Sequence, residues 1–388
     1  RKIFNYTWSN FADYHFDILR DQDLYADVKV GFEAQENKQY LLQVGAQGFP
    51  GNLELQYLSS AATPNTASTA PSDFATNSIF SNATLNYKDR YVLTGSFRRD
   101  GSSVFGANNR WGNFYSLGAT WNITEEAFMQ SVDVLSLLKL RASYGENGNA
   151  NGFGFYSALP VYRYDINYLG LSASRLTNVG FEDLTWEKNK VFNVGLDFGL
   201  FNGRLNGTVE LYDRKTSGLL FTVVPSPTAG VPNILQNIGS VSNKGVEVML
   251  SGKVIDTRDF SWELRFNFAH NKNRVTELYR DNPVVNGFQR VQVGYDVGTF
   301  YMREYAGVDP DNGRAMWWKD ADHKETTQNY SQAALIMTGK SSSPKYYGGF
   351  GSTLKYMGVS LDFLFAYNFG NYVYSIWDRY QNTEGLYL

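Results

Sequence analysis

The chain has no cysteine and is poor in charged residues, and each deficit removes a class of function. Without cysteine there is no disulfide framework, no thiolate metal site and no cysteine nucleophile. Charged residues make up 19% of the 388 residues, against about 25% in ordinary globular chains. The net charge is −3 and the basic residues are dispersed. The chain therefore lacks the electrostatic footprint of a nucleic-acid-binding protein.

Motifs that carry catalysis or bind metals are also missing. There is no Gly-x-Ser-x-Gly elbow and no phosphate-binding glycine loop. His15, His270 and His323 lie in unrelated contexts without metal-ligand spacing. Residues 309–313 (DPDNG) predict a turn, because a calcium loop needs glycine at its sixth position and glutamate at its twelfth. We expect no catalytic residue, no metal site and no cofactor.

The sequence also lacks any run of 18 apolar residues that could form a membrane-spanning helix. What it has is alternation. Residues 192–200 (FNVGLDFGL) and 205–212 (LNGTVELY) alternate large apolar with small or polar side chains, which predicts β-strands. In an outer-membrane barrel the apolar face contacts lipid and the polar face lines a wet lumen. We therefore expect Phe192, Val194, Leu196 and Phe198 to face outward and Asn193 and Asp197 to face inward.

About twelve strand-like segments can be marked, and the connections between them alternate in length. This sorting of loops favours an outer-membrane barrel over a soluble sandwich, with short turns on the periplasmic side and long loops outside. The segments are 23–34, 38–47, 78–87, 90–99, 113–123, 138–145, 189–201, 204–215, 243–255, 260–271, 345–357 and 358–369. The tight junctions are 35–37, 88–89, 201–203, 256–259 and 357–358, with one longer junction at 124–137. The long junctions are 48–77, 100–112, 146–188, 216–242 and 272–344.

The long connections carry the candidate binding residues. Residues 59–78 are small, polar and low in complexity, which predicts a surface loop. Residues 272–344 are too long for an empty loop, and we expect them to fold over the barrel mouth. They contain Trp317 and Trp318, and 146–188 contains Tyr162 and Tyr164. Aromatic faces there suit stacking on a sugar or a peptide, or else pack the loops against one another. At the longer turn, Thr124–Ser131 is expected to be a short helix with Glu125 and Glu126 near its N-terminus.

A more specific resemblance lies in residues 90–123, which carry the elements Arg98-Arg99-Asp100-Gly101-Ser102-Ser103 and Asn108-Asn109-Arg110-Trp111-Gly112. This hairpin resembles the signature hairpin of the SusC-like family of TonB-dependent outer-membrane transporters. Further matches follow collinearly to about residue 370, at 138–145, 184–188, 243–247, 294–301, 306–310 and 343–350. Residues 1–89 match only as a generic barrel.

The resemblance implies a 22-stranded barrel with an N-terminal plug domain, in the outer membrane of a Bacteroidetes-type bacterium. It also implies a TonB-contacting segment and a SusD-like surface lipoprotein that lids the mouth. About twelve strands cannot close such a wall, so we expect residues 1–388 to be part of the barrel of a longer protein, with the plug, the TonB-contacting region and the final strands outside them. The implied activity is import of an oligosaccharide or a peptide, and not an enzymatic reaction. The alternative is a soluble β-rich carbohydrate-binding module or glycoside hydrolase.

The family motif also implies roles for four charged residues at the rim of the barrel. Arg98, Arg99, Asp100 and Arg110 occupy the matching positions. We expect them to form a charge-paired base for the loops, with direct substrate contact as the alternative.

Overall fold

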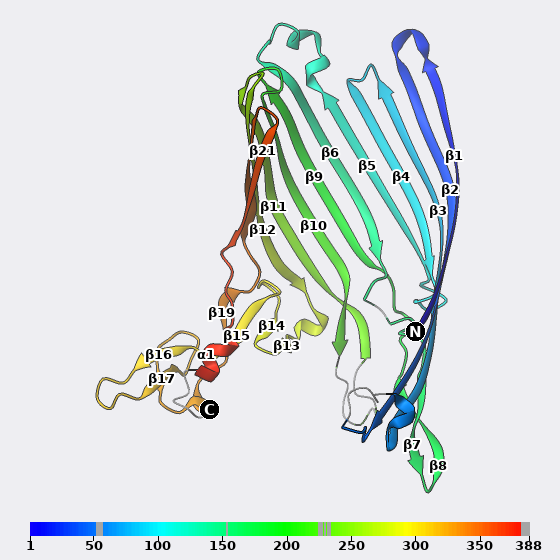
Figure 1. Ribbon diagram of the computed structural model, residues 1–388, viewed down its shortest axis with the longest axis vertical. Helices are drawn as coiled ribbons and strands as arrows, with labels where there is room; N and C mark the ends of the chain where they lie inside the picture. The colour runs from blue at the N-terminus through cyan, green and yellow to red at the C-terminus, as the bar shows by residue number, and fades with distance from the viewer. Residues whose placement is uncertain (52–56, 153, 224–227, 229, 231–233, 382–388) are drawn as a thin grey trace.

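The fold is one antiparallel sheet of twelve strands, in which each inner strand pairs with the strands before and after it and the edge strands β1 and β21 pair on one side. A computed structural model describes residues 1–51, 57–152, 154–223, 228, 230 and 234–381. Figure 1 shows the strands side by side, from β1 at one edge to β21 at the other. The strands, in sheet order, are β1 (Lys2–Leu19), β2 (Leu24–Gln47), β3 (Thr63–Tyr87), β4 (Tyr91–Ser102), β5 (Trp111–Asn122), β6 (Leu135–Asn149), β9 (Glu187–Leu200), β10 (Leu205–Val223), β11 (Ile234–Asp256), β12 (Phe260–Glu277), β20 (Tyr346–Tyr356) and β21 (Val359–Phe369).

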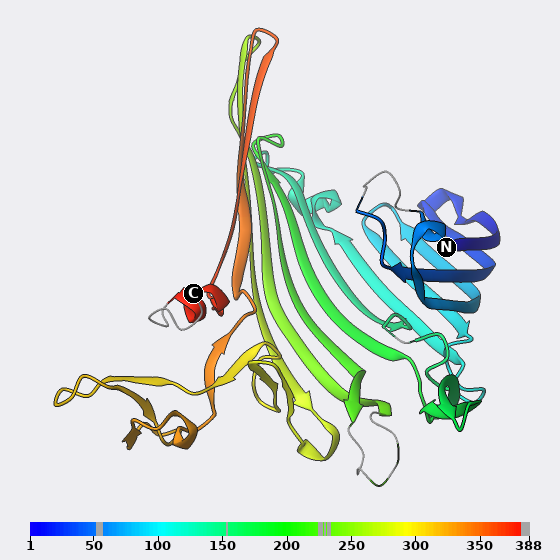
Figure 2. The same cartoon turned by 60° about the horizontal axis from the view of Figure 1, so that its bottom comes forward.

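The predicted turn at 35–37 is wrong. Residues 23–34 and 38–47 form one continuous strand, β2, and Gln35 pairs with Thr7 on one side and Thr76 on the other. The first strand of the sheet is β1, which the sequence reasoning missed. Figure 2 shows the long blue hairpin of β1 and β2 curving away from the rest of the wall. One strand was missed and another was wrongly divided in two. These two errors leave the order of short and long connections as predicted.

Several strands extend further into the loops than predicted. β3 begins at Thr63, so most of the expected surface loop at 59–78 is strand. β10 and β11 together take up much of the predicted loop at 216–242.

The predicted helix Thr124–Ser131 is also wrong, because this segment forms two short 3-10 turns, Ile123–Glu125 and Ala127–Met129.

With one exception, the connections are sorted by length onto opposite ends of the sheet. In Figure 1 the short turns after β3, β9, β11 and β20 lie at the top and the long connections lie at the bottom, but the longer connection 123–134 between β5 and β6 also lies at the top. Two long connections fold into small sheets of their own. Residues 150–186 carry the hairpin of β7 (Val161–Tyr168) and β8 (Leu171–Asn178). Residues 278–345 carry β13 (Val284–Asn286), β14 (Gln289–Val291), β15 (Thr299–Met302), β16 (Tyr305–Val308), β17 (Ala315–Trp318), β18 (Thr326–Thr327) and β19 (Ile336–Ser341).

The register of the ladders gives the sheet two chemically different faces. Directly paired residues share a face, and a step of one residue changes it. Leu196 pairs with Leu140 and Val209, and Val209 pairs with Val248. The adjacent row contains Lys139, Asp197, Thr208, Met249 and Asn267. We call these the apolar face and the polar face. Phe192, Val194, Leu196 and Phe198 lie on the apolar face and Asn193 and Asp197 on the polar face, as predicted.

Aromatic rings cover glycines on neighbouring strands and fill both faces of the wall. A Cβ atom at Gly207 would overlap the ring of Phe198 on the apolar face, and one at Gly31 would overlap the ring of Phe80 on the polar face. Since real Cβ atoms do not approach so closely, any other residue at these positions would force the ring to move. The high glycine and aromatic content therefore has a packing cause in the sheet.

Aromatic side chains also line the apolar face at the turn end. The rings of Tyr87, Tyr91 and Trp121 form a row, with centroids 6.4 Å apart at each step. This is the position of an interfacial aromatic girdle. Among the described residues, no helix is long and apolar enough to cross a membrane.

Candidate functional site

The polar face carries a network of ion pairs that spans three strands. Arg141 on β6 donates two hydrogen bonds to Asp197 on β9, at 2.7 and 3.0 Å, and one to Glu210 on β10 at 2.7 Å. Thr208 donates a further hydrogen bond to the carboxylate of Asp197 at 3.0 Å. Bidentate pairing fixes the geometry of the guanidinium group. Because these groups lie on the polar face, they form a fixed, charged row across three strands of that face.

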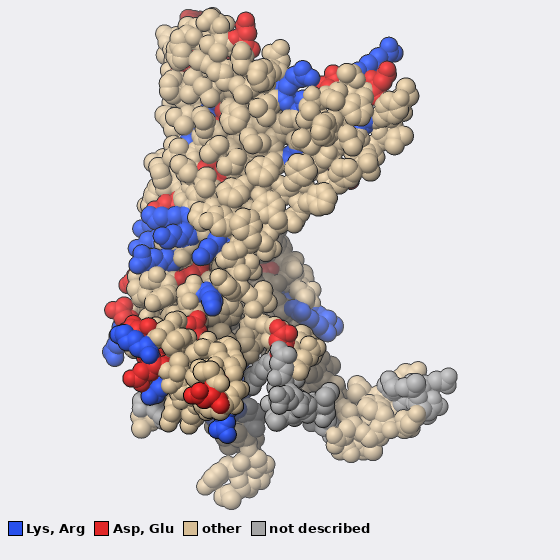
Figure 3. Space-filling model, turned by 90° about the vertical axis from the view of Figure 1, so that its left-hand side faces the viewer, with Lys and Arg blue, Asp and Glu red and all other residues tan. Residues whose placement is uncertain are grey.

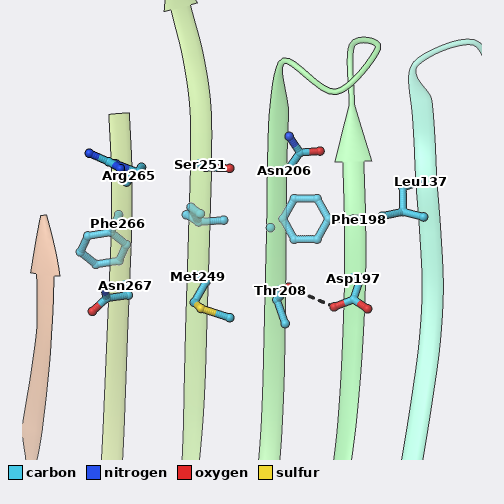
Figure 4. Close-up of a pocket in the computed structure, with 12 residues that line it drawn as sticks. Leu137, Asp197, Phe198, Asn206, Thr208, Met249, Ser251, Arg265, Phe266 and Asn267 are labelled. Atoms are coloured by element: carbon cyan, nitrogen blue, oxygen red, sulfur yellow. Dashed lines mark hydrogen bonds between the residues drawn. The ribbon is translucent and has the colours of Figure 1, made fainter. Parts of the chain in front are cut away.

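Next to this network is a shallow depression of about 440 Å³. Figure 4 shows its floor, where side chains of β9 to β12 lie side by side and Thr208 is hydrogen-bonded to Asp197. Asn206, Ser251 and Arg265 form the next row of the polar face. These side chains offer donors and acceptors to whatever occupies the lumen, but sequence reasoning did not name them. The signal that could have identified them is that they are the polar residues of segments in which apolar and polar residues alternate.

At the loop end of the wall, three of the four predicted rim residues make defined contacts. Arg98 donates to Asp100 at 2.6 Å and to Glu33 on β2 at 3.3 Å. The guanidinium of Arg99, which lies on the other face, is 5.4 Å from the ring centre of Trp111. The structure thus joins Arg98 and Asp100 and separates both from Arg99.

Arg110, the fourth rim residue, contributes through its backbone. Its carbonyl accepts hydrogen bonds from the backbone of Ser102 at 3.1 Å and from the indole of Trp186 at 3.3 Å. Its side chain is exposed.

A buried apolar cluster at the base of the loops was not predicted as part of the site. Phe105 is 1% exposed, and its ring centre is 4.9 Å from that of Trp186. Phe114 contacts Trp186 edge-on at 5.4 Å, and Leu184 and Ala158 complete the core. The cluster joins the loop after β4 to the loop after β6. The sequence signal was present, because Leu184 and Trp186 belong to the matched segment 184–188.

Tyr162 and Tyr164 lie on β7, in the hairpin that projects from the loop end (Figure 1). Their exposed fractions are 58% and 76%. The tip of the same hairpin exposes Tyr168, Leu169 and Leu171. The hairpin therefore presents an unusually apolar surface to water, of the kind that marks an interaction site.

Trp317 and Trp318 are adjacent on β17, in the small sheet of β16 to β18. Adjacent strand residues point to opposite faces, and each indole has its own partner. Trp317 contacts Tyr330 edge-on at 5.3 Å, and Trp318 stacks on His323 at 4.9 Å. His323 is also 2.9 Å from Glu304. Both indoles are half-buried, so each offers only part of its surface to a ligand.

The turn beside these tryptophans is held by a carboxylate. Asp320 accepts backbone hydrogen bonds from Asp322, Lys324 and Glu325 at 2.8 to 3.2 Å. These bonds, chiefly those from Glu325 and Lys324, hold the pKa of Asp320 below its usual range. The Asp320 carboxylate therefore closes the turn through its backbone hydrogen bonds.

The structure does not bring the two predicted aromatic pairs together. Figures 1 and 2 both place the β7–β8 hairpin and the β16–β18 sheet on opposite sides of the loop end. Within the part of the chain that the structure describes, no group of three acidic or histidine side chains is arranged to hold a metal ion.

Comparison with known proteins identifies relatives of this wall. The family model described as TonB dependent receptor-like, beta-barrel, matches residues 2–376. The TonB-dependent receptor SusC of Bacteroides thetaiotaomicron is 35% identical over 314 residues, which is 75% of this chain and 31% of that protein. The TonB-dependent receptor P39 of Formosa agariphila is 32% identical over 362 residues, 81% of this chain and 34% of that protein. The chain thus spans about a third of the length of these relatives.

Two solved transporter structures also resemble this chain. A structure of the RagAB peptide transporter superposes with a TM-score of 0.86 at 30% identity, covering 95% of this chain and 41% of that chain. The outer membrane transporter YddB from Escherichia coli superposes with a TM-score of 0.53 at 11% identity, which shows likeness of fold alone.

Proposed function

The chain belongs to the TonB-dependent receptor-like β-barrel family, and from this premise we propose that it is part of the barrel of a SusC-like nutrient importer. The family places the sheet in the bacterial outer membrane. Its relatives are transporters and receptors and not enzymes, so the soluble module and the hydrolase are set aside. The observation that carries the proposal is the two-faced sheet, with ion pairs on one face and apolar rows on the other.

The substrate that we propose is an oligosaccharide or a peptide, captured at the loop end before it enters the lumen. Tyr162 and Tyr164 support this because their rings are largely free. Trp317 and Trp318 support it because each retains a partly exposed ring beside a fixed partner. The similarity to the RagAB peptide transporter keeps the peptide open beside the glycan.

The partners that we propose are a SusD-like lipoprotein at the loop end and TonB at the opposite side. The apolar tip of the β7–β8 hairpin supports contact with a second protein, because three large apolar residues stand in water there: Tyr168, Leu169 and Leu171. Contact with TonB would come from a segment outside residues 1–388. We propose that Arg98 and Asp100 keep the rim in place while the loops move, since Asp100 orients the guanidinium of Arg98 and a second ion pair joins Arg98 to Glu33 of β2.

A growth screen tests the proposal. A deletion strain is grown on separate oligosaccharides and peptides as sole nutrients, and then complemented with the full-length protein. Loss of growth on one substrate, restored by complementation only when TonB is functional, is the expected result. Growth of the deletion strain on every substrate at the wild-type rate, or uptake that persists without TonB, would contradict the proposal.

A further inference from the structure

The outward side of β9 to β12 carries a dense group of cations just beyond the apolar rows. Phe192, Asp213, Lys244 and Lys272 form one row, and the next row toward the loop end contains Lys190, Lys215, Ser242 and Arg274. Because the two rows are two residues apart on each strand, both share the apolar face. Lys188 follows on β9. We call these six cations the basic band: Lys188, Lys190, Lys215, Lys244, Lys272 and Arg274.

The band lies directly on the lipid-facing surface. The next row toward the turn end contains Val194, Leu211, Val246 and His270. The band is on the loop side of that row, which is the outer leaflet when the long loops are extracellular. Figure 3 shows this order on one side of the molecule, with a largely uncharged upper surface, then a cluster of Lys and Arg, then mixed charges toward the loops.

Acidic side chains balance only part of the band. Glu146 pairs with Lys188 at 3.2 Å and with Lys190 at 3.5 Å. Lys244 pairs with Asp213 at 2.7 Å. Glu277, at the loop end of β12, accepts a hydrogen bond from Ser240.

The other three cations of the band stay without a counter-charge. Lys215, Lys272 and Arg274 are exposed, and none forms an ion pair with any residue that the structure describes. This leaves a local excess of positive charge at the edge of the membrane.

The band also has a cavity. About 390 Å³ of space is lined by Lys244, Lys272 and Arg274 together with Ser242, Thr276 and two valines, a volume within the range of ligand pockets. Lysine and arginine at such a site favour phosphate, to which guanidinium can donate two parallel hydrogen bonds.

We propose that the basic band binds the phosphate groups of an anionic glycolipid in the outer leaflet, with its acyl chains lying along Val194, Leu211 and Val246. A soluble anion would use the cations but not the apolar row next to them. An anionic lipid contacts both the cations and the apolar row, and its phosphates supply the counter-charge that Lys215, Lys272 and Arg274 lack. This contact fixes the depth of the wall in the membrane. It rests on the outer-membrane location and is independent of which nutrient the protein imports.

The test measures lipid binding to the full-length protein in neutral detergent by native mass spectrometry. The probes are diphosphoryl lipid A, monophosphoryl lipid A and inorganic phosphate. We expect the diphosphoryl form to bind more tightly than the monophosphoryl form. The triple variant Lys215→Gln, Lys272→Gln, Arg274→Gln should bind roughly a hundredfold more weakly, from about 1 kcal/mol per cation. Lys215→Arg with Lys272→Arg should retain the affinity.

The matched control removes the same charge from the β16–β18 sheet with Arg314→Gln, Lys319→Gln and Lys324→Gln, and should leave lipid A binding unchanged. Heat-dependent gel mobility confirms that each variant is folded. Equal binding of lipid A to the wild type and the triple variant would overturn the proposal. Displacement of lipid A by an equal concentration of inorganic phosphate would show a site for free anions and would overturn it as well.

Discussion

The guanidinium of Arg141 and the carboxylate of Asp197 form a bidentate ion pair on the polar face, with Nε and Nη2 2.7 and 3.0 Å from the two carboxylate oxygens. One residue away on each strand, Leu140 and Leu196 face each other on the apolar face. A single backbone step thus separates a charged lumen wall from a lipid-facing surface. A soluble antiparallel sheet with one wet face alternates in the same way, so it is the family match that assigns the apolar row to lipid and the charged row to the lumen.

Replacing Leu196 by arginine should destabilise the folded barrel in lipid by roughly 2–4 kcal/mol if the position lies near the middle of the bilayer. The side chain is 37% exposed on the apolar face, so the charge would enter hydrocarbon. Reversible denaturant unfolding of the full-length protein in vesicles measures the change. Asn193→Arg, on the polar face of the same strand, is the control and should cost much less. Equal costs for the two variants would contradict the assignment of faces.

Phe105→Ala should loosen the loop base without unfolding the sheet. Removing a ring that is 1% exposed from the cluster with Trp186 should cost about 3–5 kcal/mol locally. Cleavage within residues 150–186 by limited proteolysis should then accelerate at least a hundredfold when opening precedes cutting. Phe128→Ala, at an exposed position of the opposite end, should leave the cleavage rate unchanged. A wild-type rate in Phe105→Ala would show that this cluster does not anchor the loop.

Glu126 should make the turn end sensitive to acid. Tyr91 and Trp121 donate to its carboxylate at 2.5 and 3.0 Å, and these bonds, that from Tyr91 foremost, hold the pKa of Glu126 below its usual range. A lowered pKa in the folded state gives stability that is present above the unfolded pKa of about 4.3 and is lost as the pH falls through the folded pKa. The stability advantage of the wild type over Glu126→Gln should therefore shrink toward low pH.

Unfolding midpoints in detergent at several pH values follow this difference. Glu125→Gln, the exposed neighbour, is the matched control and should differ little from the wild type at any pH. A gap between the wild type and Glu126→Gln that stays constant from neutral pH to about pH 3 would argue against the anchoring role.

Substrate capture should depend more on the tyrosines of β7 than on the tryptophans of β17. Tyr164 is 76% exposed, whereas each indole already packs on a neighbouring ring. We expect Tyr162→Ala with Tyr164→Ala to weaken binding of the imported substrate, and Trp317→Ala or Trp318→Ala to have smaller effects. Isothermal titration with the substrate found in the growth screen gives the affinities, and Phe128→Ala serves as the control. Unchanged affinity in all these variants would remove both pairs from the site.

The strands were predicted well where one face of the sheet contacts lipid, because there one face must be apolar and the face toward water can be polar. The prediction failed in β2, where residues 35–37 (QEN) looked like a turn. β2 has 24 residues, or about 79 Å at 3.3 Å per residue, far more than the roughly 25 Å of the apolar belt. Beyond the belt both faces meet water and the alternation fades. β1 was missed although it alternates: Tyr6, Trp8 and Tyr14 lie on its apolar face, and Phe11 stands among Asp13 and His15 on its polar face.

The candidate site was harder to predict than the wall. The rim motif named Arg98 and Asp100, but their partner Glu33 lies on another strand and depends on the register of β2 and β3. The indoles of β17 could be named from the sequence, but their stacking on Tyr330 and His323 could not. Both the contact of Arg98 with Glu33 and the stacking of the indoles depend on residues that are far apart in the sequence or on other elements.

The sheet separates lipid from a wet lumen with a period of two residues. Site-directed spin labelling along β9 tests this separation most directly, with one cysteine at a time introduced from 192 to 198 into the full-length protein in lipid. We expect labels at Phe192, Val194, Leu196 and Phe198 to be relaxed by oxygen dissolved in the bilayer, and labels at Asn193, Gly195 and Asp197 to be relaxed by a water-soluble nickel chelate. Accessibility that does not alternate, or that alternates with the opposite phase, would contradict it.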